Sequence, residues 1–265
     1  MKDLNRYALG LHKAMEEKLF FLDHIDLHDY EFIIDFGCGT GELLRRLKPH
    51  VDLHTQRLFG FDTNVEMIKY ASQYITDPFA CIDYLTDIDH VRSLIGHLEG
   101  RKLIIFSSVF HEMTPEQQKV AMDLMVLCDA VVIRDMKRPL NNEPISNVTR
   151  NRIISQVAPW QADLFESRWG KINDKEKMYR FFLMNEFVEN FESEVEEDYF
   201  SVPWSEIAWA LEENGFELVD GLSYTLPYRY QQVKKRFNHA MQDITHRRVV
   251  YVKSTEGRDD SCPTI

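Results

Sequence analysis

One stretch decides the fold of this chain, and it reads Ile33-Ile34-Asp35-Phe36-Gly37-Cys38-Gly39-Thr40-Gly41-Glu42-Leu43-Leu44. A short apolar run ends in an acid, three alternating glycines follow, and a helical pattern begins directly after them. Glycines allow the backbone to approach a ligand closely because they carry no Cβ atom. The helix then offers free backbone N–H groups to polar atoms of that ligand. The stretch therefore predicts a buried strand, a nucleotide-type binding loop and a helix start.

The spacing of the glycines narrows the kind of ligand. The loop is G-x-G-x-G with Asp35 two residues ahead of its first glycine, whereas the dinucleotide fingerprint is G-x-G-x-x-G without that acid. A carboxylate at this strand tip would repel a pyrophosphate, but it could fix the loop and reach a cationic or amine-bearing ligand. The spacing argues against a nicotinamide-dependent oxidoreductase on a similar sheet.

The same stretch closely resembles the first motif of the class I S-adenosylmethionine (SAM) methyltransferases, where the loop holds the methionine part of the cofactor. The resemblance extends over most of the chain outside residues 139–201. It implies SAM as the cofactor and the following cofactor-binding residues in the loop: Asp35, Gly37, Cys38, Gly39 and Gly41.

Composition excludes several other classes of protein. A chain of 265 residues with 44% hydrophobic content can bury a core, and its net charge of −12 disfavours indiscriminate binding to nucleic acid or anionic membranes. The four cysteines are scattered without a C-x-x-C pair, which predicts neither a disulfide framework nor a zinc site. The N-terminus lacks an apolar signal core, and no apolar run is long enough to span a bilayer. We therefore expect a cytoplasmic protein and assign no metal ligands. Carboxylates at the strand tips could bind a cation but have no ligand spacing of their own, so metal dependence stays open.

Two further strands are expected to end in acids that complete the cofactor site. The second strand is Gln56 to Asp62, and an acid about twenty residues beyond a glycine loop usually binds a ribose diol. Asp62 is the residue in that position. The third strand is Phe79 to Tyr84, where the resemblance implies that Asp83 accepts a hydrogen bond from the adenine amine, with Tyr84 beside it.

The fourth strand, Arg101 to Ser108, is a continuous apolar run that is expected to be fully buried. Its carboxyl end should face the reacting centre, as ligands of open parallel sheets bind there. The resemblance implies that Ser107 lies beside the cofactor and that a histidine or acid lies near the methyl acceptor. We predict His111 as the general base, because neutral imidazole accepts a proton near neutral pH, with Glu112 orienting it or acting as the base itself. The alternative is that His111 caps the next helix or packs under a lid.

The fifth strand, Ala130 to Asp135, ends in two charged residues at the ligand side of the sheet. Arg134 and Asp135 are candidates for binding the substrate. Such pairs are as often structural, so a buried salt bridge or a cap for the next segment is the alternative.

Strand and helix alternation breaks off over residues 139–201, which we predict to be a helical insertion. Ile145 to Val157 and Glu176 to Phe191 have helical periodicity, and the acidic block Glu192 to Asp198 is expected to be solvated. In the resembling family, extra helices after the fifth strand commonly form a lid that defines the acceptor.

Regular architecture resumes with a helix from Ser205 to Asn214 and a strand from Phe216 to Asp220, and the last strand is Arg247 to Lys253. Between the two strands, Tyr228 to His239 mixes aromatic and basic residues. An amphipathic helix with a solvated basic face is favoured there over a nucleic-acid surface.

Together these patterns predict an α/β, Rossmann-like, seven-stranded and mostly parallel sheet with helices on both faces and an inserted helical cap. Residues 1–138 and 202–255 form the SAM-binding core in this prediction, and residues 139–201 form the cap. The expected function is transfer of a methyl group from SAM to an oxygen or nitrogen of a small molecule. The alternatives are methylation of RNA or DNA, and a regulatory SAM-binding protein without catalysis. The sequence leaves the acceptor and the oligomeric state open.

Overall fold

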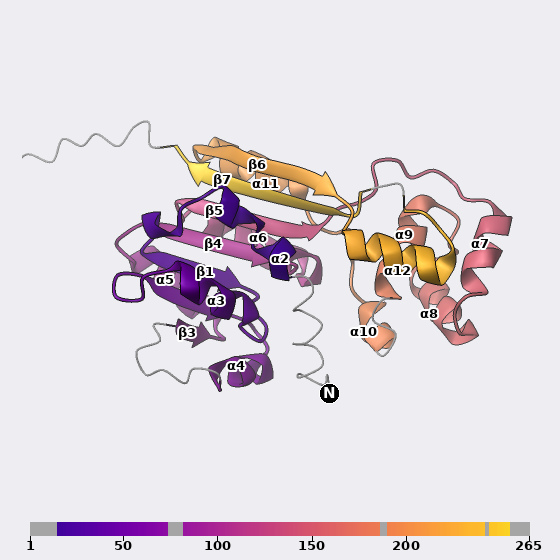
Figure 1. Ribbon diagram of the computed structural model, residues 1–265, viewed down its shortest axis with the longest axis horizontal. Coiled ribbons are helices and arrows are strands. Elements are labelled where there is room, and N and C mark those ends of the chain that lie inside the picture. Colours follow the sequence, from indigo (N-terminus) through magenta and orange to yellow (C-terminus); the bar gives the residue numbers. More distant parts are fainter. Residues whose placement is uncertain (1–14, 74–81, 186–189, 242–243, 255–265) are drawn as a thin grey trace, which may run out of the picture.

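A computed structural model describes residues 15–73, 82–185, 190–241 and 244–254 of the chain. It contains a seven-stranded sheet in the order β3-β2-β1-β4-β5-β7-β6 (Figure 1). The strands are β1 Phe32–Phe36, β2 Arg57–Phe61, β3 Ile82–Leu85, β4 Lys102–Ser107, β5 Ala130–Met136, β6 Phe216–Tyr224 and β7 His246–Lys253. The strands β1 to β5 are parallel, and β7 pairs antiparallel with both β5 and β6. The predicted mostly parallel sheet of seven strands is confirmed.

Helices cover both faces of this sheet. They are α2 Met15–Lys18, α3 Glu42–Leu47, α4 Val65–Ser72, α5 Ile88–His97, α6 Pro115–Met125 and α11 Trp204–Glu213. Helices α5, α6 and α11 share a core with one face of the strands, whereas α2 and α3 share a core with the other face. Neighbouring residues of β1 separate accordingly, because Ile34 belongs to the first core and Ile33 to the second. Burial on both faces explains why these strands read as continuous apolar runs.

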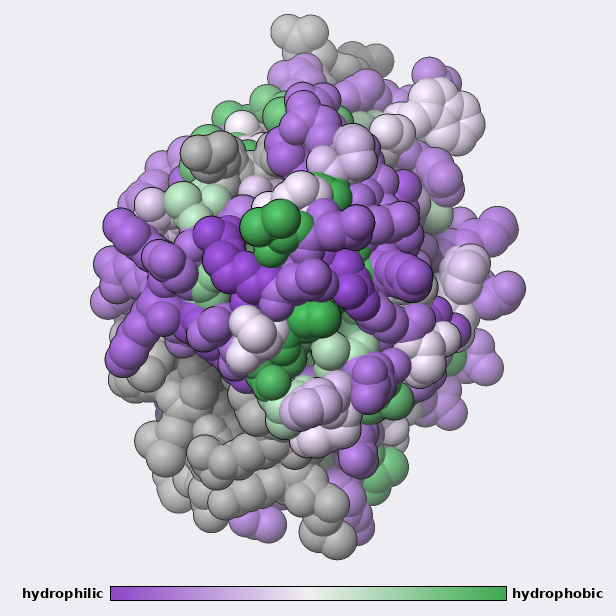
Figure 2. Space-filling view, turned by 90° about the vertical axis from the view of Figure 1, so that its right-hand side faces the viewer, coloured by the Kyte–Doolittle hydropathy of each residue, from purple (hydrophilic) through white to green (hydrophobic). Residues whose placement is uncertain are grey.

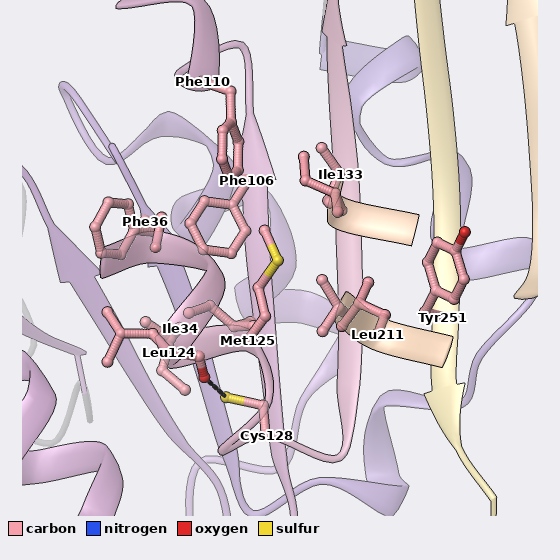
Figure 3. Packing of buried hydrophobic residues seen from close by; sticks show 14 of the residues in the cluster. Ile34, Phe36, Phe106, Phe110, Leu124, Met125, Cys128, Ile133, Leu211 and Tyr251 are labelled. Atoms are coloured by element: carbon pink, nitrogen blue, oxygen red, sulfur yellow. Dashed lines mark hydrogen bonds between the residues drawn. The ribbon is translucent and has the colours of Figure 1, made fainter. Parts of the chain in front are cut away.

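Aromatic side chains fill the first core near the ends of the central strands (Figure 3). The ring centroid of Phe106 lies 5.0 Å from that of Phe36 and 5.1 Å from that of Phe110. Met125 of α6 lies against this group, and the thiol of Cys128 donates a hydrogen bond to the carbonyl oxygen of Leu124. This packing fixes the turn that follows β4, because Phe110 lies within that turn.

The insertion forms a helical cap that lies beyond the carboxyl ends of the parallel strands (Figure 1). Its helices are α7 Asn147–Ile154, α8 Pro159–Trp169, α9 Lys175–Met184 and α10 Phe191–Glu194. Helix α12, Pro227–Phe237, joins them, since its Val233 and Phe237 belong to the same buried cluster as Phe181. The amphipathic helix predicted between the last two strands is confirmed. It packs with the cap, whereas the sequence prediction assigned residues 202–255 to the core.

Helix α8 lies within the predicted helical insertion, although no separate helix was predicted over its residues. One expectation about the cap was wrong. The acidic block is not uniformly solvated, because Glu194 is buried and accepts a hydrogen bond from the Tyr199 hydroxyl, and Asp198 forms an ion pair with Arg180 at 2.6 Å. The outer face of the cap is mostly hydrophilic, with a small hydrophobic group near its centre (Figure 2).

Cys38 and Cys128 are buried free thiols, and Cys81 and Cys262 lie outside the described residues. Among the residues that the structure describes, no helix combines the length and the apolar character that a membrane crossing requires.

Candidate functional site

The glycine loop after β1 has the backbone that the sequence predicted. Gly37, Gly39 and Gly41 have φ angles of 78°, 52° and 72°, in the left-handed region that favours glycine. A Cβ atom at Gly37 would lie 2.3 Å from Cγ2 of Val109, and nothing lies within 4 Å of the corresponding position at Gly39. The loop is therefore packed on one side and open at its centre, which lets a ligand approach the backbone of Gly39.

Asp62 follows β2 and joins this strand to the loop. Its Oδ2 accepts a hydrogen bond from the N–H of Gly39 at 2.8 Å, and its Oδ1 accepts one from the N–H of Asn64 at 2.8 Å. The carbonyl oxygen of Phe61, one residue earlier, accepts hydrogen bonds from the N–H groups of Gly37 and Cys38. The predicted ribose-binding acid thus lies in contact with the predicted glycine loop.

Asp35 is buried in β1, on the face of the sheet that α2 covers. Burial raises the pKa of its carboxyl group, the cation of Lys18 partly offsets this, and the negative charge of Asp62 adds to it. Lys18 ends α2, and its Nζ donates a hydrogen bond to the carbonyl oxygen of Ser107 at 3.4 Å. Burial lowers the pKa of Lys18, and the nearby cation of Arg134 lowers it further. Lys18 is therefore part of the site, although the sequence did not identify it.

Tyr84 lies over the loop, whereas Asp83 points away from it. A Cβ atom at Gly41 would lie 2.2 Å from the Tyr84 hydroxyl, and one at Gly60 would lie 2.6 Å from the Tyr84 ring. Side chains alternate along a strand, and Asp83 is exposed and lines a recess together with Phe59. Strand β3 also continues to Leu85, so Asp83 does not end it as predicted. Because of this alternation, the structure brings Tyr84 to the loop and leaves Asp83 apart.

Asp135 organises the turn between β4 and α6. It is fully buried, and its two oxygens accept hydrogen bonds from the N–H groups of Val109 at 2.9 Å, Phe110 at 2.7 Å and Met136 at 2.7 Å. It also pairs with Nδ1 of His111 at 2.6 Å. Burial alone would raise the pKa of Asp135, but His111 and these backbone donors hold it below its usual range. The pair with His111 corresponds to the buried salt bridge named as the alternative for this residue, whereas Asp135 accepts from Val109 and Phe110 in the turn after β4 and not only from the segment that follows β5.

His111 is buried between carboxylates from three elements. Its Nε2 lies 4.0 Å from Glu112 Oε1 and 3.9 Å from Glu197 Oε2, and the Tyr199 ring packs edge-on against the imidazole. Burial alone would lower the pKa of His111, but Asp135, Glu112 and Glu197 raise it to about 9. The side chain is therefore an imidazolium at neutral pH. This protonation state does not fit the prediction of a neutral imidazole that accepts a proton.

The cap contributes to this group through Glu197, which the sequence placed in a solvated block. One ligand atom each of His111, Glu112 and Glu197 lies within 4.8 Å of the others, close enough to surround a cation. Glu112 and Glu197 are also among the groups that raise the pKa of His111, so without a cation these contacts describe an imidazolium neutralised by carboxylates. The absence of a metal remains a prediction.

Ser107 and Arg134 are neighbours in the sheet register at the tips of β4 and β5. Both are buried, and Nη1 of Arg134 donates a hydrogen bond to Oγ of Ser108 at 2.7 Å. The Oγ of Ser107 is buried and has no hydrogen-bond partner within the described part of the chain. The predicted substrate candidate Arg134 therefore lies next to the predicted cofactor contact Ser107.

Sequence reasoning missed Lys18, Val109, Glu197 and Tyr199. Lys18 and Val109 had no signal beyond a helical pattern and an apolar residue after a strand. Glu197 and Tyr199 occur in a cap whose packing depends on contacts across the whole insertion.

Comparison with known proteins supports the same kind of domain. Residues 33–127 match the family model described as a methyltransferase domain. A segment of 55 residues is 46% identical to trans-aconitate 2-methyltransferase of Pseudomonas paraeruginosa (strain DSM 24068 / PA7). This segment makes up 20% of the chain and 18% of that relative, so the match spans less than a fifth of the relative's length.

Two solved structures have similar folds. Mycolic acid cyclopropane synthase, crystallised with S-adenosylhomocysteine (SAH), gives a TM-score of 0.53 at 12% identity. The alignment covers 90% of this chain and 83% of that chain. The plantazolicin methyltransferase BamL, in complex with a triazolic desmethylPZN analog and SAH, gives a TM-score of 0.51 at 11% identity. The alignment covers 94% of this chain and 88% of that chain. At these identities the likeness is one of fold.

Proposed function

We propose that the chain is a class I, Rossmann-like methyltransferase, and that it transfers a methyl group from SAM to an oxygen or nitrogen of a small molecule. The match of residues 33–127 to the methyltransferase-domain model and the order of the sheet support this proposal. The observation that carries the proposal is the glycine loop, with three left-handed glycines at the tip of β1 and Asp62 bonded to Gly39. The trans-aconitate 2-methyltransferase that matches part of the chain, and the methyltransferase BamL solved with a triazolic desmethylPZN analog, support a small-molecule acceptor.

The residues of the loop fit the cofactor sterically. Gly37 and Gly41 have no room for a side chain, and the space in front of Gly39 is open. In this proposal Asp62 binds the ribose, and Tyr84 flanks the adenosine. Asp35, Cys38 and Ser107 complete the cofactor contacts. Asp83 is a weaker candidate for the adenine because its side chain lies on the other face of β3.

Bound SAM supplies a methyl group on a sulfonium, which is already an excellent leaving group. The chain's own residues then have to align the acceptor and take up its proton. His111 is held by Asp135 as an imidazolium, so we assign proton uptake to Glu112 and a positioning role to His111. The cap supports this arrangement through Glu197, whose carboxylate lies 3.9 Å from His111.

The packing of helix α12 favours a small-molecule acceptor over a nucleic acid, because part of its basic face is buried. Val233 and Phe237 of this helix belong to the buried cluster of the cap, and Arg229 is buried as well, so only part of the basic residues of α12 remain for an external ligand. The net charge of −12 acts in the same direction.

The test is binding of SAH by isothermal titration calorimetry, in wild type and in Asp62→Ala. We expect wild type to bind and the variant to bind at least tenfold more weakly. Asp87→Ala is the matched control: Asp87 also follows a strand and accepts two backbone N–H hydrogen bonds, from Asp89 and His90, but away from the loop. Its loss should cost about 1 kcal/mol of stability and leave SAH affinity unchanged.

Wild type that binds no SAH would refute the cofactor assignment. Labelled SAM in an extract with the purified protein then separates the two remaining classes. A labelled small molecule supports the enzyme, labelled RNA or DNA supports the nucleic-acid alternative, and SAH binding without any labelled product supports the regulatory protein.

A further inference from the structure

A row of polar side chains ends the face of the sheet that α2 and α3 cover. In the register, Ser107 is the neighbour of Arg134, and Arg134 is the neighbour of Arg248. Neighbours across strands point to the same face. The residues two positions away along each strand belong to the core on that face: Ile105, Val132 and Val250. The row therefore follows the apolar core at the carboxyl end of the parallel strands, beside the glycine loop.

Within the described residues, Arg134 is a buried cation without a carboxylate partner. Its exposure is 3%, Nη1 donates to Ser108, and Nε has no hydrogen-bond partner within the described residues, where Arg134 also forms no ion pair. Arg180 is equally buried at 3%, but it pairs with Asp198 at 2.6 Å and with Glu176 at 3.4 Å. Because burial of an unpaired charge is costly, Arg134 is the one of these two arginines whose position calls for an external anion.

The backbone beside Arg134 is strained. Ser108 has a φ of 62°, which a residue with a Cβ atom rarely adopts. Its N–H donates to the carbonyl oxygen of Arg134 at 2.7 Å, and its hydroxyl accepts from the guanidinium. The next residue, Val109, packs against Gly37. Strain of this kind occurs at ligand-binding positions, and here it links Arg134 to the cofactor loop.

The surroundings of Arg134 add positive charge. Burial and the charge of Arg134 lower the pKa of Arg229 to about 9, and burial together with both arginines lowers the pKa of His246 well below its usual value. The Tyr224 hydroxyl is also buried: burial raises its pKa, and the adjacent guanidinium of Arg134 partly offsets this. The carboxylate of Glu17 acts on Tyr224, but it forms no ion pair with Arg134 among the described residues. A negatively charged ligand group would be stabilised here.

We propose that the methyl acceptor is a small organic anion, and that Arg134 binds its carboxylate or phosphate at the tip of β5. A guanidinium offers two parallel N–H donors to either group, and the anion would supply the negative charge that the described residues do not pair with Arg134. The inference rests on the proposed function, since it assumes that the cofactor occupies the glycine loop after β1. The acceptor would then lie on the other side of the β4 tip, next to β5. Arg134 is then a specificity-determining residue rather than a structural one.

The experiment measures ligand binding to protein saturated with SAH and to protein without it. The probes are succinate, citrate and inorganic phosphate, with succinamide as the uncharged control, and the readouts are calorimetry and the melting temperature. We expect at least one anion to bind tenfold or more tightly than succinamide. Arg134→Gln should abolish this preference, Arg134→Lys should retain part of it, and both should leave SAH affinity within about twofold. Whether succinate and citrate or phosphate bind identifies the group.

Stability distinguishes a binding role from a structural one. Without ligand, Arg134→Gln should leave the melting temperature unchanged or raise it, whereas Arg180→Gln should lower it by roughly 6 °C or more. The inference is overturned if no anion is preferred to succinamide, or if Arg134→Gln binds anions as wild type does. It is also overturned if Arg134→Gln binds SAH as much more weakly than wild type as it binds the anion, or if Arg134→Gln is as unstable as Arg180→Gln. Failure of SAH to bind wild type would refute the proposed function alone, because the arm without SAH still tests the anion site.

Discussion

Replacing Asp135 with Asn tests the arrangement around His111 most directly. An Asn side chain has one acceptor oxygen, so it cannot serve both Val109 and Phe110 on one side and both His111 and Met136 on the other. Its amide NH₂ group would face donors, and the imidazolium would lose its counter-charge. We expect Asp135→Asn to fold but to be much less stable at neutral pH.

The magnitude follows from the pKa of His111. Its rise from the ordinary value of 6.5 to about 9, at about 1.36 kcal/mol per pKa unit, corresponds to roughly 3 kcal/mol. Removal of one partner of a buried ion pair costs about 3–5 kcal/mol, in agreement with this figure. For a chain of this size, that loss lowers the melting temperature by roughly 10 °C.

The pH dependence gives a second signature. The pKa of His111 in the folded protein is higher than in the unfolded chain, so its stabilisation is complete below about pH 6.5 and is lost as pH rises through about 9. The difference in free energy of unfolding between wild type and Asp135→Asn should therefore shrink as pH rises from 6.5 to 9.

The assay is urea denaturation at several pH values, together with an NMR titration of His111. A double-mutant cycle with His111→Gln should give a coupling energy of about 2–3 kcal/mol. A destabilisation below about 1 kcal/mol, or a His111 pKa that stays near 9 in Asp135→Asn, would refute the reasoning.

Two further predictions concern the loop and the pH dependence of catalysis. Gly41→Ala should abolish SAH binding, because its Cβ atom would lie 2.2 Å from the Tyr84 hydroxyl at a backbone φ of 72°. Gly170 has a similar φ of 77° but lies in open space, so Gly170→Ala should lower stability through backbone strain alone and leave SAH affinity intact. Paired calorimetric titrations of the two variants with SAH check this difference. Once an acceptor is known, kcat should show no rise with an apparent pKa near 9, because His111 has a positioning role in the proposal; such a rise would return proton uptake to His111.

Much of the cofactor side could be predicted because its requirements are local. The left-handed backbone of the loop admits only glycine without strain, so the spacing of Gly37, Gly39 and Gly41 is visible in the sequence itself. Asp62 is one residue beyond a buried strand, and the tips of parallel strands meet at one edge, so its contact with Gly39 also follows from order along the chain. Asp83 shows the limit, because a shift of one residue along β3 decides which side chain meets the loop.

The sequence by itself determined the sheet, its glycine loop and the acids that follow β1 and β2, since periodicity and backbone conformation are set by neighbouring residues. Only the tertiary structure decided what surrounds the β4 and β5 tips. Asp135 is 24 residues from His111, and Glu197 reaches the same imidazole from the cap. Burial and the charges of such distant partners set the protonation of His111 and left Arg134 without a carboxylate partner among the described residues. Neither property exists until the sheet and the cap have folded around these side chains.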